Sequence, residues 1–209
     1  VSEIVHAHCP EKGRALLPNC LFRSSAALRQ TFLHECGRSN KNPRIFRKLY
    51  KLCQQYNLTD DSLEGDIAIG WTRPLIDDVC ASDFDLVENV ELVLDEYVAF
   101  LKKDDKKEAH GKRENVSFLS LIRPQTCCVL FQAIEAKNTK IFKYLWQRLE
   151  REGGKEALHE ALENEKSEDE DNLVSFAGRH GTPEILHILL KSARDLGLID
   201  SFISQRFHS

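Results

Sequence analysis

The chain has 209 residues, of which 42% are hydrophobic and 30% charged, and its formal net charge is −4. This length and composition allow one domain, or two small ones, with a continuous core. The negative balance argues against direct nucleic-acid binding, which needs a basic face, and no apolar run reaches the roughly 20 residues that cross a bilayer, so we expect no membrane insertion.

The first segment, residues 1–23, is predicted to be an N-terminal loop or cap, because Pro10, Gly13 and Pro18 interrupt any helix. Its possible zinc ligands are His6, His8, Cys9 and Cys20. Ten residues separate Cys9 from Cys20, which fits the tight ligand pairs of zinc motifs poorly. The chain contains seven cysteines at irregular spacing, an odd number that does not suit a secreted disulfide framework. We therefore expect a cytoplasmic or nuclear protein. The chain lacks an initiator methionine and any other methionine, which suggests either an excised fragment or modified methionines missing from the sequence.

One pattern then recurs four times. A small residue is followed by apolar residues 8, 9 and 12 positions later, starting from Cys36 (with one extra residue), Asp78, Ala133 and Ala177. The apolar positions are Ile45/Phe46/Leu49, Leu86/Val87/Val90, Ile141/Phe142/Leu145 and Ile185/Leu186/Leu189. The spacing predicts a short helix, a turn and a longer helix in each copy, near residues 31–56, 72–101, 127–151 and 172–195. Such a pair cannot bury its apolar seam alone, so we expect an all-α helical solenoid.

The first two copies contain polar residues that break the pattern. His34, Glu35 and Cys36 are adjacent on a helix and point in different directions, so they predict no catalytic set. We expect His34 to hydrogen-bond a turn and Cys36 to fill a small core position. In the second copy, Asp77 and Asp78 replace an apolar and a small residue, so this copy fits the pattern least well.

The later copies carry clearer helix boundaries. In the third copy, Trp146 is expected to seal the core between copies, and Gly153-Gly154 is expected to end the helix. Residues 155–164 then predict a short amphipathic helix, with Ala157, Leu158, Ala161 and Leu162 on one side. In the fourth copy, we expect Gly181 in a left-handed conformation, Thr182 as an N-cap and Pro183 at the first helical position.

Polar segments separate the copies. Residues 58–70, 102–114 and 163–171 are predicted to be solvated loops, and the acidic segment 163–171 could also steer a basic partner. The tripeptide Ile67-Ala68-Ile69 is the only strand signal. Residues 196–209 are predicted to form a C-terminal capping helix.

Residues 24–195 resemble the ankyrin-repeat family. The hexapeptide Thr31-Phe32-Leu33-His34-Glu35-Cys36 is similar to the family's Thr-Pro-Leu-His-x-Ala opening, and Gly181-Thr182-Pro183 is similar to its turn. The distances between Leu49, Val90, Leu145 and Leu189 are 41, 55 and 44 residues. Because the family's period is about 33 residues, the resemblance implies about four degenerate repeats with long inter-repeat insertions.

The resemblance also implies where a partner would bind. Ligands of the family lie along the concave face, against the tips before each opening and the exposed ends of the first helices. The matching positions are Arg29, Gln30, Arg38, Trp71, Thr72, Arg123, Gln125, Glu135, Asp171, Arg179 and His180, together with Cys80 in the second copy. Trp71 is the first residue to test, because Trp and Arg concentrate interface energy.

These patterns favour a non-catalytic protein–protein interaction domain with a protein partner. No set of titratable residues converges and no Gly-rich phosphate loop is present, so we expect no catalytic residue, no metal site and no cofactor. Three alternatives remain open: a regulatory or assembly domain of a larger channel or signalling enzyme, an all-α enzyme with an unrecognised site, and a solenoid of the armadillo or HEAT type, which the spacings of 41 and 44 residues suggest.

Overall fold

The computed structural model describes residues 32–55, 75–104, 129–164, 167 and 171–199. All elements within these residues are helices, which confirms the all-α class. The expectations for residues 1–23, for Ile67-Ala68-Ile69, for most of the polar insertions and for residues 200–209 lie outside the described residues.

The eight described helices form four pairs, each with a short first helix and a longer second one. The first helices have six to eight residues and the second helices at least 13. The pairs are α3 (Phe32–Ser39) with α4 (Pro43–Gln55), α6 (Leu75–Cys80) with α7 (Val87–Asp104), α9 (Val129–Glu135) with α10 (Thr139–Asn164), and α11 (Leu173–His180) with α12 (Pro183–Asp195).

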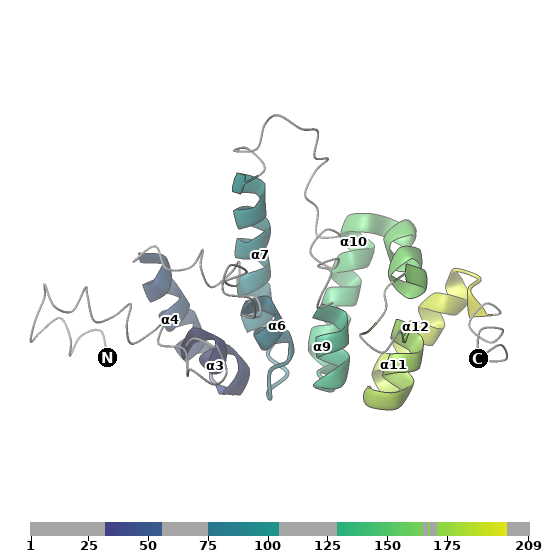
Figure 1. The fold of residues 1–209 in the computed structure, drawn as a ribbon, viewed down its shortest axis with the longest axis horizontal. Coiled ribbons are helices and arrows are strands. Elements are labelled where there is room, and N and C mark those ends of the chain that lie inside the picture. Colours follow the sequence, from purple (N-terminus) through teal and green to yellow (C-terminus); the bar gives the residue numbers. More distant parts are fainter. Residues whose placement is uncertain (1–31, 56–74, 105–128, 165–166, 168–170, 200–209) are drawn as a thin grey trace, which may run out of the picture.

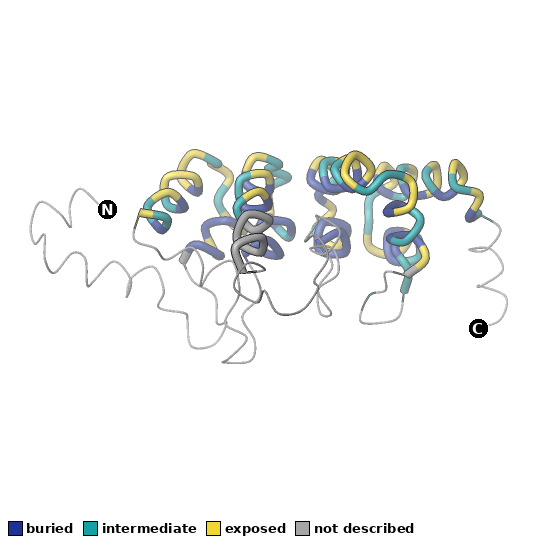
Figure 2. Tube along the Cα trace, turned by 90° about the horizontal axis from the view of Figure 1, so that it is seen from above, coloured by how far each residue is buried: buried dark blue, intermediate teal, exposed yellow. Residues whose placement is uncertain are grey.

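The pairs stack side by side in two rows (Figure 1). The short helices α3, α6, α9 and α11 pack against one another in sequence order, and we call them the inner row. The longer helices α4, α7, α10 and α12 do the same and form the outer row. Seen from above, the outer row presents its exposed residues on one side of the molecule and its buried residues toward the inner row (Figure 2).

The apolar seam of the pattern forms most of the core between the rows. In the third copy all three seam residues, Ile141, Phe142 and Leu145, are fully buried, and Trp146 is buried beside them as predicted. The rings of Phe142 and Trp146 stack with their centroids 5.8 Å apart. The Trp146 indole N–H donates to the Ser192 hydroxyl on α12 at 3.0 Å, which joins the third pair to the fourth. Trp146 therefore seals the junction between these pairs.

One seam residue is not where the pattern predicts it. Ile45, the first seam position of α4, is 44% exposed, whereas Phe46 beside it is fully buried. The prediction is wrong because a different face of α4 meets its neighbours. Among the described helices α4 packs against α3 and α7 with Phe46, Tyr50 and Cys53, which share one helix face, and Ile45 lies about 100° away from Phe46 around the helix.

The fourth pair is capped largely as the sequence predicts. The Thr182 hydroxyl accepts a hydrogen bond from the Ile185 N–H at 3.3 Å, and Pro183 opens the helix. Gly181, however, has φ −79° and ψ −175°, so the expected left-handed conformation is wrong. A Cβ atom at Gly181 would lie 2.8 Å from the Ala177 carbonyl oxygen, so close packing excludes a side chain there.

The left-handed residue lies instead in the third copy, at Lys137, with φ 60°. The Asn138 N–H donates to the Ala133 carbonyl and the Lys137 N–H to the Ile134 carbonyl, at 2.9 and 3.0 Å. These two bonds form a Schellman motif, which ends a helix with a left-handed residue. Lys137 thus closes α9 at the position where the resembled family has glycine.

Helix α10 is bent at Gly154, which has φ 67° and ψ −158°. The bend ends the first straight segment where Gly153-Gly154 predicts a terminator. The segment after it is helical, as predicted, and buries Ala157, Leu158, Ala161 and Leu162. This second segment therefore adds an apolar side to the core of the third pair.

Candidate functional site

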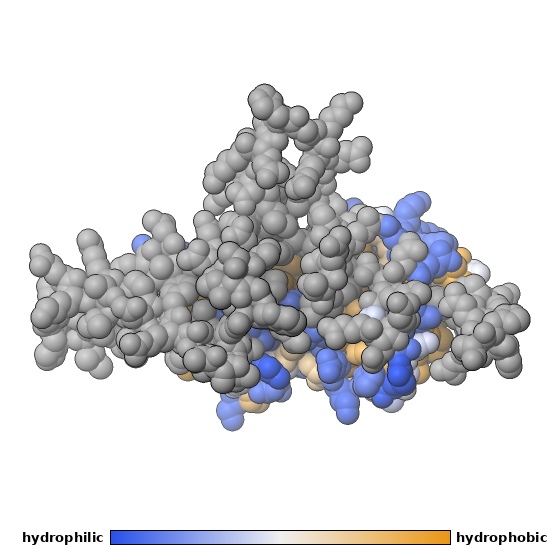
Figure 3. Space-filling model, viewed as in Figure 1, coloured by the Kyte–Doolittle hydropathy of each residue, from blue (hydrophilic) through white to orange (hydrophobic). Residues whose placement is uncertain are grey.

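The turns that join inner and outer helices lie along one edge of the stack, at residues 40–42, 81–86, 136–138 and 181–182. We call this the turn edge; it runs along the lower side of the molecule in Figure 1. In the space-filling view, hydrophilic side chains gather there among the described residues, with hydrophobic patches between them (Figure 3). Neighbouring turns are tied by hydrogen bonds between residues more than 40 positions apart in the chain.

Asn138 holds the second and third turns together. Its side-chain amide is 4% exposed and donates to the carbonyls of Cys80 at 3.0 Å and Ser82 at 2.7 Å. Asp85 reinforces the same junction, since its carboxylate accepts from the N–H groups of Lys140 and Ile141, both at 2.8 Å. A carboxylate at these free N–H groups also interacts favourably with the dipole of α10. The sequence alone did not reveal this junction, because its partners are 55 to 58 residues apart.

The junctions to the first and fourth turns have fewer hydrogen bonds. Between the first and second turns, the Arg38 carbonyl accepts from the Ser82 hydroxyl at 3.0 Å and from the Asp83 N–H at 2.9 Å. Between the third and fourth, the hydroxyls of Thr139 and Thr182 hydrogen-bond at 2.9 Å. The turn edge is therefore one connected framework from α3 to α12.

Six of the candidate residues are described: Cys80, which is treated below, and five others. Four of these five end an inner helix at this edge, and Asp171 stands at the other end of α11. Arg38 ends α3, Glu135 ends α9, and Arg179 and His180 end α11; all four are exposed. Asp171 precedes α11 and is only partly exposed. Because α3, α6, α9 and α11 pack in order, these helix ends follow one another along the stack.

Asp171, Arg179 and His180 form a small group at the α11 end of the edge. Arg179 and Asp171 are ion-paired. The His180 ring lies over Phe176 with centroids 4.5 Å apart, and Phe176 meets Phe131 of α9 edge to face at 5.0 Å. Arg179 and Asp171 are therefore paired with each other, and the aromatic rings of Phe176 and Phe131 pack beneath His180.

The remaining candidates divide into two sets. Cys80, which the alignment of the second copy put at the surface, is fully buried, so that prediction is wrong. All six residues of α6 are buried, and the Asn138 amide donates to the Cys80 carbonyl, so the end of α6 lies inside the junction between the second and third turns. The other candidates lie outside the described residues: Arg29, Gln30, Trp71, Thr72, Arg123 and Gln125.

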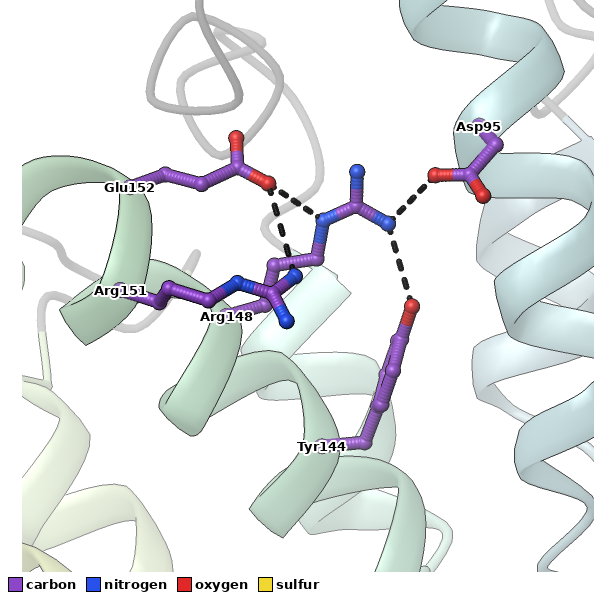
Figure 4. Close-up of polar contacts among 5 residues, drawn as sticks. All are labelled: Asp95, Tyr144, Arg148, Arg151 and Glu152. Atoms are coloured by element: carbon purple, nitrogen blue, oxygen red, sulfur yellow. Dashed lines mark hydrogen bonds and ion pairs between the residues drawn. The ribbon is translucent and has the colours of Figure 1, made fainter.

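A second polar cluster lies in the outer row, centred on Arg148 of α10 (Figure 4). The Arg148 guanidinium donates to Asp95 of α7 at 2.6 Å, to Glu152 at 2.7 Å and to the Tyr144 hydroxyl at 3.1 Å. Burial lowers the pKa of Arg148, but these hydrogen bonds outweigh it and raise the pKa above the usual value. The cluster therefore keeps a cation between two carboxylates and links α7 to α10.

The buried residues of the first copy show no nucleophilic arrangement. His34 and Cys36 are both buried, and Cys36 fills a core position as predicted. Burial raises the pKa of the Cys36 thiol, and it raises the pKa of the Cys53 thiol to about 11. A thiol with a raised pKa is a poor nucleophile, because the thiolate is the reactive form.

These thiols give the first testable prediction. A shift of the Cys53 pKa from 9.0 to about 11 reduces its thiolate fraction near neutral pH about a hundredfold. We expect iodoacetamide to label Cys53 at least about a hundred times more slowly in the folded protein than in urea. Peptide mass spectrometry measures both rates, and the folded-state rate should rise as the pH approaches the raised pKa. Equal labelling in both states would contradict the burial of Cys53.

Searches of protein-family models, of curated proteins and of solved structures found no match to this chain. Among the residues that the structure describes, no group of three or more His, Cys, Asp or Glu side chains is placed to hold a metal ion. None of the described helices is long and apolar enough to cross a membrane. The described part is therefore defined as an all-α stack of helical pairs.

Proposed function

We propose that the chain is a non-catalytic protein–protein interaction domain built from four degenerate ankyrin-like repeats. A protein partner would lie along the inner row and the turn edge, where the concave face of an ankyrin-like solenoid is expected. The observation that carries the proposal is the row of exposed, chemically different side chains at the inner helix ends: Arg38, Glu135, Arg179 and His180. These residues differ from copy to copy, which suits recognition of one particular partner.

The framework beneath these side chains supports the same proposal. Hydrogen bonds fix the turns relative to one another: the Asn138 and Ser82 side chains donate, and the Asp85 carboxylate accepts. Asp171 holds the Arg179 guanidinium by an ion pair before any partner arrives. Side chains that are already ordered lose less conformational entropy on binding, so a fixed edge of this kind favours affinity.

The cysteines support the proposed location. Cys36, Cys53 and Cys80 are buried free thiols in the described part of the chain. Buried free cysteines behave as small apolar residues and are retained most readily where thiols stay reduced. We therefore expect the domain to work in the cytoplasm or the nucleus.

The test is a double substitution at the proposed face. We expect Trp71→Ala with Arg179→Ala to abolish partner binding while far-ultraviolet circular dichroism stays unchanged, because both residues are proposed anchors and neither is an apolar position of the repeated pattern. Affinity capture with quantitative mass spectrometry, from the cell type that makes the protein, compares wild type with the variant. Proteins retained by wild type and lost from the variant are the expected partners.

The matched control is Lys143→Ala with Lys191→Ala, two exposed residues on the outer helices α10 and α12. It should capture the same proteins as wild type. If the Trp71/Arg179 variant also captures them all, the inner-row assignment is wrong.

A further inference from the structure

The exposed side of α4 carries five basic residues and no acidic one. They are Lys41, just before the helix, and Arg44, Arg47, Lys48 and Lys51 within it. The four helical residues are spaced i, i+3, i+4 and i+7, so they share one face of the helix. All five are exposed, in a chain whose net charge is −4. We call these five residues the basic stripe.

Within the part of the chain that the structure describes, the charges of the basic stripe are not paired. Among the described residues, no ion pair joins any of its five cations to a carboxylate. The neighbouring outer helix α7 carries Glu88 and Glu91 on its surface, and neither pairs with a cation of α4. Like charges spaced i, i+4 on a helix destabilise it slightly, so the charges of the stripe do not stabilise α4.

An apolar edge runs beside the stripe. Ile45 is 44% exposed, and Leu49 and Leu52 continue its side of the helix at i+4 and i+7, partly buried against the core. An exposed isoleucine flanked by cations offers an apolar contact together with charge. A partner that satisfies both needs carboxylates for the stripe and at least one apolar side chain for Ile45.

We propose that this face of α4 binds an acidic peptide segment of another protein, with an apolar residue between its carboxylates. The surface belongs to the outer row, so it is separate from the inner-row interaction proposed above and does not depend on it. Charge complementarity carries the choice of ligand: the stripe attracts an anion, and the apolar edge favours an anionic ligand that also carries an apolar side chain.

Two other anionic partners fit the surface less well. The stripe spans only about 10 Å from Arg44 to Lys51 at 1.5 Å per residue, and the carboxylates of α7 lie beyond it, so an extended phosphate backbone would meet repulsion. A membrane surface would be contacted by one short helix whose apolar side is already buried in the core. A short acidic peptide avoids both problems.

The experiment measures fluorescence polarisation of a labelled synthetic peptide that repeats Glu-Glu-Leu. We expect Arg44→Glu with Lys48→Glu to raise its Kd about tenfold or more, because each reversed charge replaces attraction by repulsion. Ile45→Ser should raise the Kd about fivefold through the lost apolar contact. A peptide that repeats Gln-Gln-Leu should bind far more weakly to wild type.

The control Lys143→Glu with Lys191→Glu changes the net charge equally at exposed sites on other helices. It should leave the Kd within about twofold of wild type. The proposal is overturned if this control weakens binding as much as the α4 variant, or if wild type does not bind the acidic peptide.

Two further probes distinguish the other occupants. Tighter binding of a DNA duplex, or of phosphatidylserine vesicles, that Arg44→Glu with Lys48→Glu abolishes would assign the stripe to phosphate instead. Sedimentation analysis covers self-association: a dimer of the wild type that dissociates in the same variant would make a second copy the occupant. Each of these results overturns the acidic-peptide proposal, and none bears on the Trp71/Arg179 test.

Discussion

Replacing Ile141 by alanine should lower the free energy of unfolding by about 2–5 kcal/mol. Ile141 is fully buried at the start of α10, in the core that α10 shares with α7, α9 and α12. Truncation removes apolar surface from that core and leaves a cavity that the surrounding helices fill only in part. Urea unfolding followed by circular dichroism measures the change.

The matched control is Ile45→Ala, at the same position of the pattern in the first copy. Because Ile45 is 44% exposed, we expect a loss of no more than about 0.5 kcal/mol. If the two substitutions cost the same, the difference between α4 and α10 that the structure describes is wrong. The pair therefore tests which face of α4 is packed against the core.

Replacing Asn138 by alanine should lower the free energy of unfolding by about 2–4 kcal/mol. The substitution deletes both side-chain hydrogen bonds and leaves the carbonyls of Cys80 and Ser82 at a buried junction without this donor. Losing a donor to a buried carbonyl costs more than the net value of a hydrogen bond, because the carbonyl is not returned to water. The same urea experiment applies.

Asn42→Ala provides the comparison for Asn138. The Asn42 side chain is exposed and accepts from the Arg44 N–H at 3.0 Å, within its own turn. We expect this local cap to contribute about 1 kcal/mol. A cost for Asn138 no larger than that for Asn42 would show that the contacts between turns do not stabilise the stack.

Much of the helix pattern was predictable, because it depends on residues close together in the sequence. Thr182 and Pro183 cap α12 by local geometry, and Gly154 interrupts α10 where two glycines allow it. The exposure of Ile45 was not predictable, since it depends on which helices lie beside α4. Gly181 was predicted to be left-handed because glycines that follow a helix often are. The structure shows instead that contact with Ala177 excludes a side chain at position 181.

The candidate site was predictable only in outline. Arg38, Glu135, Arg179 and His180 are exposed helix ends, and the alignment of the copies identified them from the sequence. Cys80 is the exception, because the Asn138 amide of the third copy donates to its carbonyl at a buried junction between turns. The contacts that organise the edge, such as Asn138 with Ser82, join residues whose proximity only the stacking creates.

The unequal junctions of the turn edge determine how the stack would open. In the described residues, two side chains of the second and third turns make four hydrogen bonds across their junction, whereas the junction to the first turn rests on one carbonyl. In a linear array each unit is stabilised only by its neighbours, so the weakest junction sets where fraying begins. Among the described residues, the junction to the fourth turn rests on the single Thr139–Thr182 bond, so either terminal pair, α3/α4 or α11/α12, can detach while the two central pairs remain folded. A ligand held on α4 would slow hydrogen exchange locally, in α3, α4 and their neighbours, and leave α12 unaffected.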